Sequence, residues 1–176
     1  MNSPIEKKVV FILASSNFRD EEYFQTKVIL QASGVSIDTA AVNDPEEMTG
    51  TQGGKAKTTI QFSEISPNIY DGLILVGGHG SKKYFHNKKV HKILNSFYHH
   101  NRAIGAIGLA SGILVKTDFI KKLELTGSLK VKKYLCQAGG IWSNNDLVVD
   151  KKIITARGPV VAFKFGERFG KILIDE

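Results

Sequence analysis

Three short apolar runs of this sequence are each followed by residues that could take part in chemistry. Glu22 follows the first run in ASSNFRDEE, a glycine pair and His79 follow the second in LVGGHG, and Gly108 follows the third in AIGLASG. In several α/β enzyme folds, the sharp turn between a strand and a helix carries the catalytic nucleophile. Here that turn falls on Gly108, which has no side chain. The sequence therefore poses two alternatives: chemistry carried by other residues, or an enzyme fold that has lost its chemistry.

Two other side chains are candidates to replace the missing nucleophile. Ser111 lies one turn beyond Gly108, and His79 is its nearest candidate base. We expect Ser111 instead to bond backbone amides at the start of a helix. Cys136, in KKYLCQAGG, lies away from the predicted strand ends, and we expect it to be a small buried hydrophobic residue.

Glu22 has two interpretations. A partly buried carboxyl with a raised pKa could serve as a general acid or base. A carboxylate in the first turn of a helix can instead be satisfied by backbone amides. Because no thiolate lies beside it, we favour a residual pocket residue over a catalytic one. Arg157, in ITARGP, is expected to form a structural ion pair.

The histidines do not have the spacing of a metal site. His86 and His91 are five residues apart, and His99 and His100 are adjacent, so the usual i, i+4 pair is absent. We predict no metal and no cofactor.

Strand and helix patterns alternate along the chain and predict an α/β fold. Apolar runs at 7–15, 35–42, 70–78 and 103–107 are typical of buried strands, and helical patterns cover 20–34 and 88–101. Two strands joined by a tight turn at 150–152 precede a last helix that has Pro159 in its first turn. The prediction is a flavodoxin-like three-layer αβα sandwich: a mostly parallel central sheet, with a β-hairpin before the last helix.

Length and composition limit the remaining possibilities. The 176 residues correspond to one domain, residues 1–176, and the stretch 43–58 is the most loop-like region. A single cysteine suits a reducing compartment, and no apolar run approaches the roughly 20 residues of a membrane span, so we expect a cytoplasmic protein with no membrane partner. The net charge of +7 and the lysine clusters favour a solvated surface over nucleic-acid binding, because no nucleic-acid motif accompanies them.

The chain resembles the ThiJ/PfpI superfamily, which includes intracellular proteases, small-aldehyde hydratases and the parkinsonism-associated deglycase, and which is related to class I glutamine amidotransferase domains. The resemblance covers nearly the whole chain and rests on four pieces in order. They are the acidic pair ending at Glu22 with Gly34 twelve residues later, YDGLILVGGHG, RAIGAIG with its following helix, and VVDKKIITARGP.

The resemblance assigns roles to several positions. The elbow of the family reads approximately Ala-Ile-Cys-His-Gly, so Gly108 stands in the place of the cysteine and Leu109 in the place of the histidine. Glu22 stands in the place of the conserved glutamate, and Gly77 and Gly78 in the place of the oxyanion donors. A histidine used by part of the family would fall near Ser128, and an acidic residue used by another branch would fall on Lys82.

These assignments predict a pseudoenzyme that lacks the cysteine-dependent hydrolase, deglycase or glyoxalase activity. It would bind a small-molecule ligand or a protein partner at a vestigial pocket, in a stress-related role. The expected pocket residues are Gly77, Gly78, His79, Leu109 and Ser111. One alternative is an active hydrolase or lyase that uses Glu22 and water, with the two glycine amides stabilising the oxyanion. Another is a basic interaction module for nucleic acid or protein. The resemblance also implies a homodimer or a larger homo-oligomer.

Overall fold

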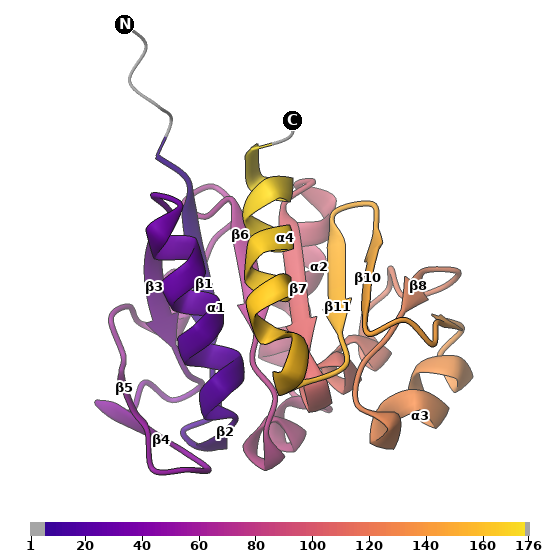
Figure 1. Cartoon of the computed structure of the whole chain (residues 1–176), viewed down its shortest axis with the longest axis horizontal. Coiled ribbons are helices and arrows are strands. Elements are labelled where there is room, and N and C mark those ends of the chain that lie inside the picture. The colour runs from indigo at the N-terminus through magenta and orange to yellow at the C-terminus, as the bar shows by residue number, and fades with distance from the viewer. Residues whose placement is uncertain (1–5, 175–176) are drawn as a thin grey trace, which may run out of the picture.

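A six-stranded sheet forms the middle layer of the computed structural model, which describes residues 6–174 (Figure 1). The first five and the last two residues of the predicted domain 1–176 lie outside the described residues. The strands of the sheet are β1 (Lys8–Ile12), β3 (Ser36–Ala40), β6 (Gly72–Leu75), β7 (Ala103–Ile107), β10 (Leu147–Asp150) and β11 (Ile153–Ala156).

The strand order is β10-β11-β7-β6-β1-β3, and every neighbouring pair except β10–β11 is parallel. The strand order reverses between β1 and β6, which is where doubly wound sheets place their ligands. The antiparallel β10–β11 pair is the predicted hairpin, and Lys151 in its turn has a φ of 56°. The predicted sheet is therefore confirmed.

Helices cover both faces of the sheet (Figure 1). Helices α1 (Asp20–Ala32) and α4 (Ala162–Ile174) pack together on one face, and α2 (Lys88–His99) lies on the other. Gly166 allows the close approach of α4 to α1, because a Cβ at that position would lie 3.2 Å from the Ile29 side chain. Each face has its own buried apolar cluster, so the three-layer αβα sandwich is confirmed.

The region expected to be most loop-like, residues 43–58, contains regular structure. Strands β4 (Glu47–Gly50) and β5 (Lys55–Lys57) form an antiparallel hairpin, and β4 also pairs with β2 (Ser16–Phe18). Asp20 holds the turn of this hairpin, because its carboxylate accepts the amides of Gln52 and Gly54 at 2.8 Å each. Burial opposes ionisation of Asp20, but these hydrogen bonds outweigh it and lower its pKa.

The segment after β7 is a 3₁₀ helix, η3 (Gly108–Lys116), rather than the α-helix that the pattern predicted. Two glycines within it disfavour α-helix, and Gly112 packs against the Phe85 ring. The remaining short elements are η1 (Phe62–Glu64), η2 (His79–Tyr84), β8 (Glu124–Leu125), η4 (Leu129–Val131), α3 (Lys132–Gln137), β9 (Ile141–Trp142) and η5 (Pro159–Val161). Within residues 6–174, no helix has both the length and the apolar character needed to span a membrane.

Candidate functional site

The carboxyl ends of β1, β6 and β7 bring Glu22, Gly77 and Gly108 together. Glu22 lies in the first turn of α1, and its Oε2 accepts a hydrogen bond of 2.8 Å from the Gly77 amide, just beyond β6. A Cβ placed on Gly108, directly after β7, would overlap the other carboxylate oxygen of Glu22. The Glu22 carboxyl therefore fills the volume that the side chain of an elbow nucleophile would need.

The backbone at Gly108 has the conformation of an elbow. Its φ is +64°, in the left-handed region that side chains rarely adopt. The loop that follows η3 closes over it, because the Ser128 amide donates to the Gly108 carbonyl at 3.0 Å. The position that the resemblance assigned to a family histidine thus lies at the elbow, with serine in its place.

Burial controls the charge of Glu22. The side chain is 2 % exposed, and desolvation raises its pKa from 4.5 to about 8, against the opposing effects of the Gly77 amide and the Arg19 charge. The carboxyl is therefore protonated at pH 7. In that state it can donate a proton or a hydrogen bond, but it cannot accept a proton from a water molecule.

The glycine turn after β6 is locked against β2. The Arg19 amide donates to the Gly77 carbonyl at 3.0 Å, and a Cβ on Gly78 would overlap the backbone around Asn17 and Arg19. The Gly77 amide is occupied by Glu22, so it is not free to stabilise an oxyanion. This arrangement disfavours the alternative in which both glycine amides serve a working hydrolase.

The predicted Ser111 and His79 pair does not form. Ser111 is fully buried, and its Oγ donates to the Ala106 carbonyl at 3.4 Å rather than accepting from backbone amides, which corrects the expected capping role. His79 is exposed, and among residues 6–174 no hydrogen bond joins it to Ser111. Among the described residues, the Ser111 hydroxyl has a backbone carbonyl and not a base as its hydrogen-bond acceptor.

A cavity of about 360 Å³ borders the elbow on the Leu109 side. Leu109 is half-buried and lines the cavity together with Phe85, Val131 and Tyr134. Cationic side chains also line it, including Lys82, the position at which the resemblance implied an acidic residue. The cavity is large enough for a small ligand, but its lining includes Leu109 alone among the expected pocket residues, and neither Glu22 nor Gly108 contributes to it.

Three further positions can be compared with the sequence prediction. Cys136 is exposed rather than buried, because it lies on the outer side of the short helix α3. Gly158 is a residue of the site that the sequence analysis did not predict. A Cβ there would lie 3.8 Å from Glu22 Oε1, and the residue belongs to the stretch VVDKKIITARGP. The expected ion pair of Arg157 is confirmed, with Asp146 at 3.1 Å.

The described part of the chain shows no cluster of three or more histidine, cysteine or acidic side chains that could hold a metal ion. His91, on α2, is buried and has its Nε2 3.1 Å from the Ile113 carbonyl. Burial lowers its pKa, so the ring is favoured in its neutral form.

Comparison with known proteins gives consistent matches over nearly the whole chain. The sequence model of the DJ-1/PfpI family matches residues 7–171. An uncharacterized protein of Methanocaldococcus jannaschii is 30% identical over 162 residues, which cover 90% of this chain and 78% of that protein. Deglycase PfpI of Pyrococcus furiosus is 24% identical over 166 residues, which cover 94% of this chain and 99% of the deglycase.

Solved structures of ThiJ/PfpI proteins have the same fold. The crystal structure of a ThiJ/PfpI domain protein from Brachyspira murdochii superimposes with a TM-score of 0.93 at 20% identity, covering 97% of this chain and 99% of that chain.

Proposed function

This chain belongs to the DJ-1/PfpI family, and from that premise we propose that it is a pseudoenzyme that binds a small ligand at its elbow. It would lack the cysteine-dependent hydrolase, deglycase or glyoxalase chemistry. The observation that carries this proposal is the elbow itself: Gly108 keeps the left-handed turn, and the Glu22 carboxyl occupies the place of a nucleophilic side chain.

The state of Glu22 favours binding over turnover. Because its pKa is about 8, the carboxyl is neutral at pH 7, and its burial keeps it from direct contact with a ligand in the cavity beside Leu109. A mechanism with Glu22 as general base would need the ionised form, and it would also need a free oxyanion donor. The Gly77 amide is already bonded to Glu22. The ligand would occupy the apolar cavity beside Leu109, next to the elbow turn.

Other parts of the functional prediction rest on the resemblance or, for the cytoplasmic location, on the single cysteine and the short apolar runs. A homo-oligomer, a cytoplasmic location and a stress-related role stay predictions, as does a protein partner in place of a small ligand.

The purified protein is expected to give no turnover of methylglyoxal or of a panel of small peptide amides at pH 7. The physical reason is that the elbow has no thiolate and Glu22 is protonated. Rates of the wild type and of Glu22→Gln should equal the rate without protein, while the P. furiosus deglycase serves as the reference enzyme. Turnover by the wild type that is lost in Glu22→Gln would instead establish a cysteine-free mechanism and refute the pseudoenzyme proposal.

Gly108→Cys is expected to create a reactive thiol. The new side chain would displace the flexible end of Glu22, and a neutral carboxyl beside the sulfur would stabilise the thiolate by hydrogen bonding. The measurement is the rate of alkylation by iodoacetamide against pH, in a Cys136→Ser background because the native thiol is exposed. We expect a midpoint below the ordinary thiol pKa of about 8.5.

The matched control is Gly34→Cys in the same background, since Gly34 also has a positive φ but has no atom within 4 Å of a Cβ. It should titrate as an ordinary thiol. An unreactive thiol at position 108 would show that this turn is not a nucleophile elbow.

A further inference from the structure

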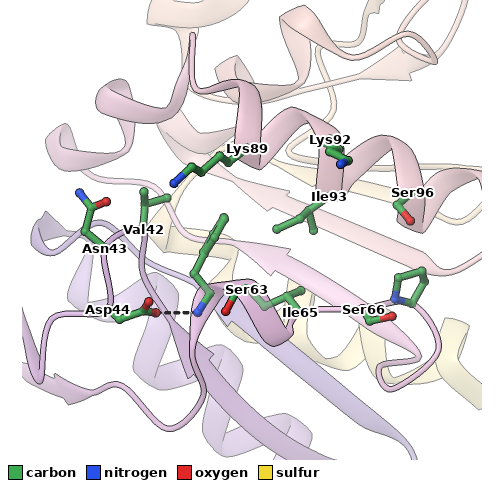
Figure 2. Close-up of a pocket in the computed structure, with 12 residues that line it drawn as sticks. Val42, Asn43, Asp44, Ser63, Ile65, Ser66, Lys89, Lys92, Ile93 and Ser96 are labelled. Atoms are coloured by element: carbon green, nitrogen blue, oxygen red, sulfur yellow. Dashed lines mark hydrogen bonds between the residues drawn. The ribbon is translucent and has the colours of Figure 1, made fainter.

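A second cavity lies away from the elbow, between α2 and the chain segment that precedes β6. Its volume is about 530 Å³, which is within the range of small-molecule sites. Residues 42–44 after β3, residues 62–67 around η1, and one face of α2 line it (Figure 2). None of the residues assigned to the elbow contributes to its lining.

The cavity exists because no long helix covers this part of the sheet. Between β5 and β6 the chain forms only the short segment η1, so one flank of α2 is left open. Hydrogen bonds hold the wall opposite α2 in place. Asp44 accepts a hydrogen bond from the Phe62 amide, and Gln61 and Glu64 form a capping box around η1. The space is therefore formed before any ligand binds.

The cavity combines an apolar interior with a cationic rim. Val42, Ile65 and Ile93 supply the apolar surface, and Figure 2 shows Ile93 pointing from α2 into the gap. Lys89 and Lys92 are exposed and lie three residues apart, so they share one side of the helix.

Neither lysine has an ion-pair partner among residues 6–174. The acidic side chain in the lining, Asp44, is already bonded to the Phe62 amide. Asp44 keeps its negative charge in that hydrogen bond, so two lysines and one carboxylate leave the lining with a net positive charge. Figure 2 shows Lys89 reaching toward Val42 and Asn43 across the cavity mouth.

We propose that this cavity is a binding site for a small amphipathic anion. A carboxylate or phosphate head would lie between the ammonium groups of Lys89 and Lys92, and the apolar body would contact Val42, Ile65 and Ile93. Both parts of the ligand are needed: the apolar surface gives affinity by burial, and the lysine pair selects the charge of the head group.

The test compares four ten-carbon probes by isothermal titration calorimetry at fixed ionic strength and below their micelle concentrations. Decanoate and decyl phosphate should bind, and decanol and decylamine should bind at least ten-fold more weakly. The two anions distinguish a carboxylate head from a phosphate head, and binding of either one supports the site. Amide shifts in ¹⁵N NMR spectra should concentrate in residues 42–44, 62–67 and 88–96.

Variants locate the interaction. Lys89→Glu combined with Lys92→Glu should weaken binding of the anions at least ten-fold, and Ser96→Trp, which fills the cavity from α2, should abolish it. The control with the same change in net charge is Lys164→Glu combined with Lys171→Glu on α4, across the sheet, which should bind as the wild type does.

Three results would overturn the proposal: no binding of either anion, equal affinity for decanol or decylamine, or amide shifts centred on Leu109 and Val131 at the elbow. A fourth result would also overturn it: if the α4 double variant lost as much affinity as the Lys89→Glu and Lys92→Glu double variant, net charge alone would explain the binding.

Discussion

Glu22→Gln is expected to stabilise the protein strongly at alkaline pH while changing little at pH 5. The pKa of Glu22 is raised from 4.5 to about 8 in the folded state. Between these two values the unfolded chain releases the proton and the folded protein keeps it, so wild-type stability falls as the pH rises. Above about pH 8 the wild type has lost the full amount of stability, on the order of 2–5 kcal/mol. Glutamine mimics the neutral carboxyl and can still accept the Gly77 amide.

The measurement is urea unfolding of both proteins at intervals from pH 5 to pH 9, read by circular dichroism. The stability of Glu22→Gln relative to the wild type should rise steadily up to about pH 8 and then level off. Glu21→Gln is the matched control, because it removes the same charge from the next residue, whose side chain pairs with Arg19 near the surface. Its effect should stay below about 1 kcal/mol. Parallel curves for the wild type and Glu22→Gln would mean that the elbow carboxyl ionises normally.

Gly78→Ala is expected to destabilise the fold by more than about 3 kcal/mol, far more than alanine at other glycines with positive φ. The φ of Gly78 is +96°, and the added Cβ would overlap backbone atoms around Asn17 and Arg19, which cannot move without breaking the contact between β2 and the glycine turn. At Gly108 the added Cβ meets only the flexible end of Glu22, so Gly108→Ala should have an intermediate effect.

Gly34→Ala isolates the contribution of backbone strain. Its φ is +79°, but no atom lies within 4 Å of the added Cβ, so we expect a loss of about 1–2 kcal/mol. Free energies of unfolding from urea titrations give the ranking directly. If Gly78→Ala lowers the free energy of unfolding by no more than Gly34→Ala does, the contact between β2 and the glycine turn does not hold Gly78 rigidly.

The main strands and the mostly parallel sheet could be predicted from local patterns. Runs such as Val9–Ile12 are apolar at every position because their strands are buried on both faces, and parallel strands with intervening helices allow few topologies. The hairpin turn at 150–152 was also a local feature, whereas Pro159, predicted in the first turn of the last helix, lies in the 3₁₀ turn η5 that leads into α4. The placement of Gly108 at a strand end followed from the same reasoning.

Local patterns failed where distant residues decide the structure. The hairpin between Glu47 and Lys57 is held by Asp20, which is about thirty positions earlier in the chain. Ser111 turns to the Ala106 carbonyl because its segment is a 3₁₀ helix packed under the loop at 127–128. Cys136 is exposed because α3 lies outside the main layers, which no local pattern shows.

The sequence by itself determined the α/β architecture and the absence of a side chain at the elbow, because both follow from the order of residue types along the chain. Only the tertiary structure decided what replaces that side chain. The Glu22 carboxyl lies in the elbow because the ends of β1, β6 and β7 converge there, and its burial raises its pKa to about 8. The cavity beside Lys89 and Ile93 likewise arises only when η1 and α2 come together on the same face of the sheet, because its walls come from separate parts of the chain.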